Sequence, residues 1–480
     1  MEPFSAVATT GIYCVPTCVA KPHHRNIHRF DLAAAAEAAG YRPCLRCRPY
    51  RSPQPVPQAG PELVCRAVQM VVDGALDGIT EAEFGRRLGV SGRHLRRLFL
   101  EHVGVTPAQL ARSRRAHFAR RLLDDTDLTF TEVAFASGFG SVRQLNRDCR
   151  AIFRAPPSEL RARRRRSDRL VADGGLPLRL PFDGPLEWDT MLDYFAARAI
   201  PGVEHVSEGV YRRTVLVQGH PGVLEMSPGD AHHLVLVAHL PRWEGLIHIV
   251  QRARRIFSLD APVDDAVSHL SHDPVLGDLV AKRPGLRVPG TWDAFETGVR
   301  AIVGQQVSVA GATTITGRLV ERLGTPVPGL HQLGLGYTFP SPATLAGSDP
   351  SAFSGLGLTG ARIDAIRGFA AAVDRGAVRL DRSVPLEQLV ASITAIGGLG
   401  PWTAHYIALR LGERDAFPAA DLGLRRALNR VAPTPDGSLD TLARGWSPCR
   451  ATAAVQLWHT GAGANGSSNG QRSRLAAASG

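Results

Sequence analysis

Four cysteines near the start of the chain have the spacing of a metal site. They form two pairs, Cys14/Cys18 and Cys44/Cys47, and the segment between the pairs is long enough for two turns to meet at one tetrahedral ion. Two disulfides or four unrelated thiols are the alternatives, but no apolar signal segment precedes the pairs, and the chain has 7 cysteines in all. We therefore predict that Zn2+ is the cofactor and that these four thiolates bind it.

A second group of residues, late in the chain, could bind phosphate and stabilise a cation. Gly398 and Gly400 come just before Pro401, a residue that suits the first turn of a helix. Bare backbone N–H groups beside a helix N-terminus can bind a phosphate, although a glycine turn between two helices can also serve packing alone. Asp421 offers a carboxylate farther along, and as a helix N-cap it would have a structural role that is compatible with a chemical one.

The length and the charge distribution of the chain indicate what kind of protein positions these groups. With 480 residues the chain exceeds a single hydrophobic core, which predicts several domains. No run of about 18 apolar residues occurs, so we expect a cytoplasmic protein with no membrane partner. Residues 1–170 contain 28 Lys+Arg against 16 Asp+Glu and so hold the whole net charge of +12. Nearly all of these cations are arginines, which favours nucleic acid as a partner over a merely solvated basic face.

Helical periodicity between residues 61 and 166 predicts two helix-turn-helix elements. In the first, Ser91 caps a helix that carries Arg93 and Arg96, and in the second Ser141 begins the corresponding helix. The side chains expected to face DNA on that second helix are Arg143, Gln144, Asn146 and Arg147. Such helices can lie in the major groove, whereas the alternative is a helical bundle with a basic face.

The N-terminal third resembles two known families. Residues 9–18 and 40–47 resemble the zinc module of the Ada response proteins, in which four cysteines bind zinc and the first accepts a methyl group from a methylated DNA phosphate. This resemblance implies that Cys14 is the methyl acceptor, and loss of its negative charge would tighten DNA binding. Only eight residues precede Thr9, fewer than in that family, so a purely structural zinc site is the alternative. Residues 88–161 resemble the AraC-type double helix-turn-helix.

The C-terminal half resembles the AlkA-type 3-methyladenine DNA glycosylases of the helix-hairpin-helix superfamily. The matching residues lie between Leu176 and Thr460 and include 198–204, 283–287, 303–309 and 396–404. The resemblance implies a catalytic role for Asp421. It also implies that the aromatic walls of a base pocket are Trp402, Tyr406 and Trp458, for which core packing is the alternative. The DNA contacts that it implies are Gly398, Gly400 and Gln306. Gln306 would fill the gap left by the flipped base, although the family's namesake has a leucine there.

The substrate chemistry and several missing residues narrow the expected reaction. An alkylated purine is a cationic leaving group, so the site needs a carboxylate beside the sugar and an electron-rich pocket rather than a general acid. Relatives that cleave the DNA backbone have a lysine at the position of Trp402, so we expect a monofunctional enzyme. After Cys149 only Cys449 remains, which excludes an iron–sulfur cluster, and no Pro-Cys-His-Arg motif of a second methyltransferase half occurs.

We therefore predict a multidomain, mainly α-helical protein. Its parts are a small zinc-bound α+β module at 1–52, an all-α double helix-turn-helix at 61–166, an α+β (TBP-like) AlkA N-terminal domain at 176–285, an all-α helix-hairpin-helix glycosylase domain at 286–462 and a disordered tail at 463–480. The expected function is DNA alkylation repair by DNA-3-methyladenine glycosylase II, joined to a methylphosphotriester methyltransferase that regulates transcription.

The alternative function is a transcription regulator whose C-terminal half only docks on DNA. The expected partners are double-stranded DNA, with alkylated bases, methylated phosphates or a promoter operator, and RNA polymerase. The protein is expected to be a monomer.

Overall fold

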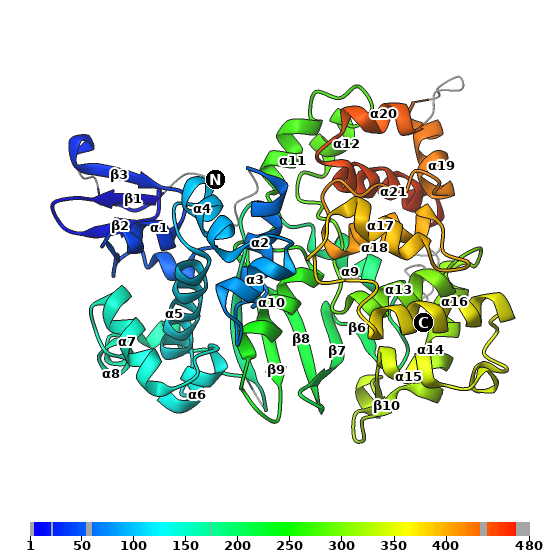
Figure 1. Ribbon diagram of the computed structural model, residues 1–480, viewed down its shortest axis with the longest axis horizontal. Helices are drawn as coiled ribbons and strands as arrows, with labels where there is room; N and C mark the ends of the chain where they lie inside the picture. Colours follow the sequence, from blue (N-terminus) through cyan, green and yellow to red (C-terminus); the bar gives the residue numbers. More distant parts are fainter. Residues whose placement is uncertain (1–3, 21–22, 54–59, 173, 433–438, 467–480) are drawn as a thin grey trace, which may run out of the picture. The chain divides into compact units, whose positions relative to one another are not determined.

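The computed structural model describes residues 4–20, 23–53, 60–172, 174–432 and 439–466 (Figure 1). The chain divides into two compact units. The first comprises Met1–Phe182, Val215–Arg254 and Asp381–Pro385, and the second comprises Asp183–Thr214, Arg255–Leu380 and Leu386–Gly480. The chain passes from one unit to the other three times within residues 176–285, so the region predicted as one α+β domain contributes to both units.

In the first unit, a four-stranded sheet and one helix position the cysteine pairs. The sheet has the order β3-β1-β2-β4, with β1 (Phe4–Val7), β2 (Ile12–Cys14), β3 (Ile27–Phe30), β4 (Arg42–Pro43) and α1 (Ala33–Ala38). Phe4, Ala6 and Tyr13 point into a small core together with alanines of α1. Strands β2 and β4 are parallel, with Tyr13 opposite Pro43, so the residues that follow, Cys14 and Cys44, leave the sheet side by side.

The helical part of the first unit confirms the two predicted helix-turn-helix elements. Its helices are α2 (Glu62–Val72), α3 (Glu81–Arg87), α4 (Gly92–His102), α5 (Pro107–Asp125), α6 (Phe130–Ala136), α7 (Val142–Phe153) and α8 (Pro157–Ala162), with short 3-10 turns at His24–Asn26, Pro49–Arg51 and Arg166–Asp168. Ser91 and Ser141 cap α4 and α7 as predicted, each accepting a hydrogen bond from the backbone N–H three residues on. Gly89 and Gly138 end α3 and α6 with φ of 77° and 79°, a conformation that favours glycine.

A buried polar group joins the metal module to α5. Tyr13 donates its hydroxyl proton to Glu37 over 2.8 Å. The Nε2 atom of His117, on α5, lies 2.6 Å from the same carboxylate oxygen. Because Tyr13 directly precedes Cys14, this contact places one cysteine of the cluster next to the long helix between the two helix-turn-helix elements.

Buried ion pairs make a second junction between the same two parts. Arg48, the residue after Cys47, lies 2.7 Å from Asp168 and 4.0 Å from Asp124. Arg51 lies 3.3 Å from Asp124, which is fully buried at the end of α5. Paired charges of this kind are costly to break because the remaining partner stays buried. Both cysteine turns are therefore anchored to the helical part of the first unit.

The α+β character predicted for the middle of the chain is confirmed. A five-stranded sheet has the order β5-β9-β8-β7-β6, with β5 (Leu176–Pro181), β6 (Glu204–Ser207), β7 (Val210–Val217), β8 (His220–Asp230), β9 (His233–His239), α9 (Trp188–Ala196) and α10 (Leu246–Ile256). In β9 alternate residues are buried, as expected for a strand with one face in the core. Strand β8 was not predicted, and its pairing with β9 shifts register between Pro228 and Asp230.

The remainder of the second unit is helical, as predicted, apart from one short ladder between β10 and β11. Its elements are α11 (Val263–Leu270), α12 (Gly277–Lys282), α13 (Ala294–Val303), α14 (Val309–Leu323), β10 (Thr325–Pro326), β11 (Tyr337–Thr338), α15 (Pro342–Gly347), α16 (Gly360–Asp374), α17 (Leu386–Thr394), α18 (Pro401–Leu411), α19 (Leu422–Val431), α20 (Leu439–Gly445), α21 (Arg450–Gly466) and 3-10 turns at His331–Leu333 and Pro350–Phe353. Helix α21 includes residues 463–466, which were assigned to the tail, and residues 467–480 lie outside the described part. Among the described residues, no helix combines the length and apolar composition needed to cross a bilayer.

A buried charge cluster holds the β6–β7 hairpin against α13 inside the second unit. Arg213 lies 2.8 Å from Glu296 of α13 and 3.4 Å from Glu204 of β6. Its guanidinium also lies 5.4 Å from the ring centroid of Trp292. Arg300 approaches Glu204 to 3.1 Å, so two cations balance two buried carboxylates.

Replacing Arg213 with methionine tests this cluster. Arg213→Met leaves two buried carboxylates with one cation, so we expect the free energy of unfolding of the second unit to fall by about 3–5 kcal/mol. Urea denaturation followed by tryptophan fluorescence measures it, because all tryptophans except Trp243 lie in that unit. The matched control is Arg375→Met on the exposed end of α16, expected within about 0.5 kcal/mol of wild type. Equal stability of the two variants would contradict the assignment.

Candidate metal centre and candidate active site

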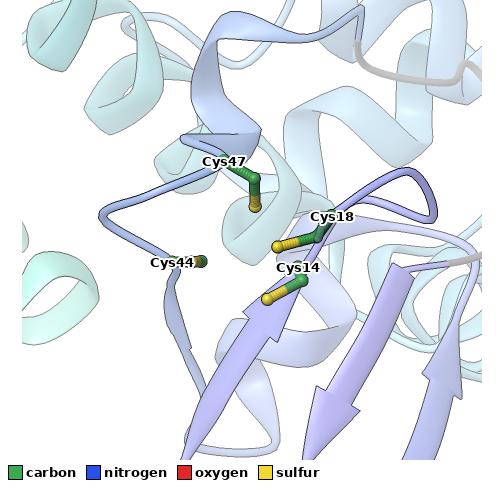
Figure 2. Close-up of side chains that lie close together, drawn as sticks. All are labelled: Cys14, Cys18, Cys44 and Cys47. Atoms are coloured by element: carbon green, nitrogen blue, oxygen red, sulfur yellow. The ribbon is translucent and has the colours of Figure 1, made fainter. Parts of the chain in front are cut away.

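The four cysteines converge in the first unit. Cys14 ends β2, Cys18 follows in a tight turn, Cys44 comes directly after β4 and Cys47 lies in the next turn (Figure 2). Their four sulfur atoms all lie within 4.8 Å of one another. Cys14 is buried at 7% exposure, and the other three are half-buried. The predicted pairs therefore form one cluster, and no two of these cysteines are joined as a disulfide.

The donor set fits a structural zinc site. Four thiolates around one dication, with metal–sulfur distances near 2.3 Å, need sulfur atoms about 3.8 Å apart, which agrees with the spacing observed. Within the cluster the thiols compete for protons: a hydrogen bond with Cys47, then burial, raises the pKa of Cys14, while the same bond lowers the pKa of Cys47 to about 6. A bound zinc ion would keep all four sulfurs deprotonated.

Most of the side chains predicted to contact DNA lie on the surface of α4 and α7. Arg93 and Arg96 are exposed on α4, and Arg143 and Arg147 are exposed on α7. Three of these side chains on α7 are engaged within the protein, among them Arg147, whose Nε donates to the carboxylate of Asp148 over 3.1 Å. Gln144, although exposed, accepts a hydrogen bond from the N–H of Gly140, and Asn146 is half-buried and donates to the carbonyl of Val142.

Asp421 has the role of an N-cap and of a shared hydrogen-bond acceptor. It precedes α19, and its Oδ1 accepts from the backbone N–H of Leu424 over 2.9 Å. The same oxygen accepts from the indole N–H of Trp458 over 3.0 Å, and Oδ2 accepts from the indole N–H of Trp402 over 2.8 Å. The carboxylate is half-exposed, so it has a fixed orientation and remains open to the surface.

The three predicted pocket aromatics form one cluster around this carboxylate. The rings of Trp402 and Tyr406 are stacked, with centroids 5.5 Å apart and an interplanar angle of 16°. Tyr406 and Trp458 meet at 62° with centroids 6.3 Å apart. All three side chains are half-buried, so they are neither a sealed core nor freely solvated. A flat ligand beside Asp421 would meet aromatic faces.

The glycine hairpin and Gln306 are both exposed, as a DNA contact requires. Gly400 is the N-cap of α18. Gly398 has φ of 83°, and a Cβ atom at this position would lie 3.3 Å from the side chain of Ala365. Gln306 sits between α13 and α14 with φ of 56°, which is strained for a residue with a side chain. Gln305 connects the two turns, since its amide donates to the carbonyl of Gly398 and to the hydroxyl of Thr403.

Sequence reasoning missed the residues that surround the hydroxyl group of Tyr406. Arg410, one turn later on α18, donates to the hydroxyls of Tyr406 and Tyr194 over 3.1 Å and 2.8 Å. Arg198 lies over the ring of Tyr194 at 3.9 Å. Tyr194 on α9 and Arg198 just after it are four residues apart, which is a sequence signal for a contact, but Tyr406 and Arg410 lie more than 200 positions away.

Comparison with known proteins accounts for most of the chain. Family models match four consecutive segments: the metal binding domain of Ada at 3–50, a helix-turn-helix domain at 84–163, the AlkA N-terminal domain at 177–293 and the HhH-GPD superfamily of base excision DNA repair proteins at 299–449. The structure of a 3-methyladenine DNA-glycosylase from Archaeoglobus fulgidus superposes with a TM-score of 0.52 at 21% identity, over 58% of this chain and 97% of that one. This likeness concerns the fold alone.

Two curated proteins are similar over long stretches. The DNA-3-methyladenine glycosylase 2 of Escherichia coli (strain K12) is 32% identical over 286 residues, which are 58% of this chain and 96% of that protein. The probable bifunctional transcriptional activator/DNA repair enzyme AlkA of Mycobacterium tuberculosis (strain ATCC 25618 / H37Rv) is 39% identical over 461 residues, which are 95% of this chain and 92% of that protein. The chain therefore belongs to the family of bifunctional AlkA proteins, in which an Ada-like metal-binding and helix-turn-helix half is joined to a helix-hairpin-helix half of the base-excision type.

Proposed function

We propose that this protein is a monofunctional DNA-3-methyladenine glycosylase that hydrolyses the N-glycosidic bond of alkylated bases. The observation that carries the proposal is the half-exposed carboxylate of Asp421, held by two indole N–H groups within an aromatic cluster. The similarity to named glycosylases over the whole second half supports it. The exposed glycine hairpin and Gln306 supply what a protein needs to hold a duplex while one nucleotide is flipped out.

The reaction follows from these positions. The carbon–nitrogen bond breaks with its electrons going to the cationic base, which leaves neutral and needs no proton donor. The sugar then carries positive charge, and the Asp421 carboxylate stabilises it and orients the attacking water, whose oxygen bonds to the sugar carbon as one proton is released to solvent. Because both carboxylate oxygens already accept hydrogen bonds, the group is set in place before substrate arrives.

For the N-terminal half we propose a sensor of methyl phosphotriesters that binds a promoter operator and contacts RNA polymerase. The sulfur of Cys14 would attack the methyl carbon of the phosphotriester, forming a sulfur–carbon bond as the carbon–oxygen bond breaks and a phosphodiester anion leaves. The four-cysteine cluster and the match to the metal binding domain of Ada support this role.

A regulator whose second half only docks on DNA is the other candidate. A docking role needs the exposed glycine hairpin but gives no reason for the arrangement around Asp421, where three N–H donors from three helices hold one carboxylate at the surface. That arrangement favours catalysis, and excision of methylated bases from duplex DNA by the full chain decides between the two.

Asp421→Asn tests the catalytic carboxylate. The variant loses the charge that stabilises the sugar cation, and we expect excision of methylated bases to fall by about 10²-fold or more while DNA binding is retained. Asp293→Asn is the matched control, because Asp293 is the N-cap of α13 and accepts from the N–H of Glu296 in the same way. It should excise at a near-normal rate. Near-normal turnover by Asp421→Asn would remove this residue from the mechanism.

The indole at position 402 predicts the absence of a covalent intermediate. Trp402 has no amine to form an imine with the opened sugar, so borohydride should trap no enzyme–DNA adduct. Product strands should remain intact on a gel until alkali cleaves the abasic site. Recovery of a trapped adduct would show that another amine of the chain attacks the sugar. The enzyme would then cleave the DNA backbone as well as the glycosidic bond.

Methylation of Cys14 distinguishes a reactive zinc site from a structural one. Incubation with DNA that carries methylated phosphates should add one methyl group, about 14 Da, to the peptide that contains Cys14, with zinc retained. Affinity for DNA should then rise, and the gain should shrink as salt increases. Cys65 and Cys149 serve as internal controls in the same digest. An unmodified Cys14 in zinc-loaded protein would make the module purely structural.

A further inference from the structure

Arg410 is a buried cation whose hydrogen-bond acceptors are all neutral. Its side chain is 6% exposed, Nε donates to the carbonyl of Pro289 and Nη2 donates to the carbonyl of Gly290, each over 2.6 Å. Nη1 donates to the hydroxyl oxygens of Tyr194 and Tyr406. Arg213 in the same unit is paired directly with carboxylates, whereas Arg410 donates only to oxygens without formal charge, and the Glu204 carboxylate acts on it as a nearby charge rather than as a hydrogen-bond partner. A nearby anion would therefore be stabilised.

The surroundings of the Tyr406 hydroxyl are positive. The charged and titratable groups around it are Arg410 on its own helix, Tyr194 on α9, Arg198 just after α9 and Arg300 on α13, with the Glu204 carboxylate of β6 acting on both Arg410 and Arg300 and with Asp421 at the start of α19 beside the aromatic cluster. Burial acts to raise the pKa of Tyr406, but the charges of Arg410 and Arg198 outweigh it and lower the pKa to about 8. Burial raises the pKa of Tyr194, so Tyr406 is the one of the two neighbouring tyrosines that loses its proton first.

Tyr406 also belongs to the proposed base pocket. Its ring stacks on Trp402 and meets Trp458, the two indoles that hold Asp421. Its hydroxyl lies 3.4 Å from that of Tyr194. A charge that appears on the Tyr406 oxygen therefore arises within the aromatic cluster that a flipped base would enter.

We propose, on the basis of the glycosylase function proposed above, that Tyr406, Tyr194 and Arg410 select positively charged bases by proton release. When a cationic alkylated base enters the cluster, the Tyr406 O–H bond breaks, its proton goes to water and the electron pair stays on the oxygen. The phenolate is then held by donors from Arg410 and Tyr194 and balances the charge of the base. A neutral base gives no such gain, so Tyr406 keeps its proton and the hydrogen bonds of Arg410 go only to neutral oxygens.

The direction in which affinity for the base depends on pH follows from this proton release. A cation in the pocket lowers the pKa of Tyr406 below its value of about 8 in the free protein. Between those two values binding releases one proton, so affinity for a cationic base should rise by up to about tenfold per pH unit and level off above about pH 8. Binding of a neutral base should lack this rise, because it leaves Tyr406 protonated.

The test uses the full chain and duplex DNA with either 3-methyladenine, which is cationic, or hypoxanthine, which is neutral. Release of each base is measured under subsaturating, single-turnover conditions between pH 6 and 9. We expect the wild-type rate for 3-methyladenine to rise by up to about tenfold per unit below pH 8, and the rate for hypoxanthine to lack this rise. Tyr406→Phe should abolish the rise, and Tyr194→Phe should move it to higher pH because the phenolate loses one donor.

A direct readout separates this role from simple packing. Phenolate absorbs in the near ultraviolet, so mixing wild type with the 3-methyladenine duplex at about pH 7 should give a transient phenolate signal that Tyr406→Phe lacks. Tyr41→Phe, whose hydroxyl contacts His28 in the metal module, is the matched control and should behave as wild type. Identical pH profiles for wild type and Tyr406→Phe would overturn the inference alone. Release of neither base by wild type at any pH would instead overturn the proposed function and this inference with it.

Discussion

The second half of the molecule depends on one carboxylate with three donors. Asp421 accepts an N–H from each of α18, α19 and α21, through Trp402, Leu424 and Trp458. A shift of any of these helices would leave a polar N–H or a carboxylate oxygen without its partner, which costs free energy that packing alone does not recover. The same bonds orient both indoles, so the aromatic cluster and the carboxylate proposed to be catalytic are set by a single constraint.

The second unit buries arginines in two different ways, and the difference bears on function. Arg213 is surrounded by Glu204 and Glu296, so its charge is neutralised and its contribution is structural. Arg410 donates only to carbonyls and two tyrosine hydroxyls, so no hydrogen-bonded carboxylate neutralises its charge. Uncompensated charge next to a ligand site is a means of tuning that site, because it shifts the equilibrium of every titratable group nearby.

In the first unit the metal centre is built into the DNA-binding part rather than tethered to it. The residues adjacent to two of the cysteines, Tyr13 and Arg48, end in buried polar contacts with α5 or with the turn at Asp168. Helix α5 in turn lies between the two helix-turn-helix elements. A change of charge at the cysteine cluster therefore occurs in the same compact unit as the exposed arginines of α4 and α7, where it can add to their field.

The sequence by itself determined the features that arise from neighbouring residues. Cysteine spacing predicted the metal cluster, and Ser91 and Ser141 predicted the starts of α4 and α7, because capping acts over three residues. Strand β8 was not predicted, because the prolines and glycines within it disfavour strands, and only its place in the sheet between β9 and β7 overrides them.

Only the tertiary structure decided which groups that are distant in the sequence interact electrostatically. It brought Trp458 to Asp421 across 37 positions and Arg410 to Tyr194 across 216. The strength of an electrostatic interaction depends on the distance between the groups and on the exclusion of water, and neither can be read from the order of the residues.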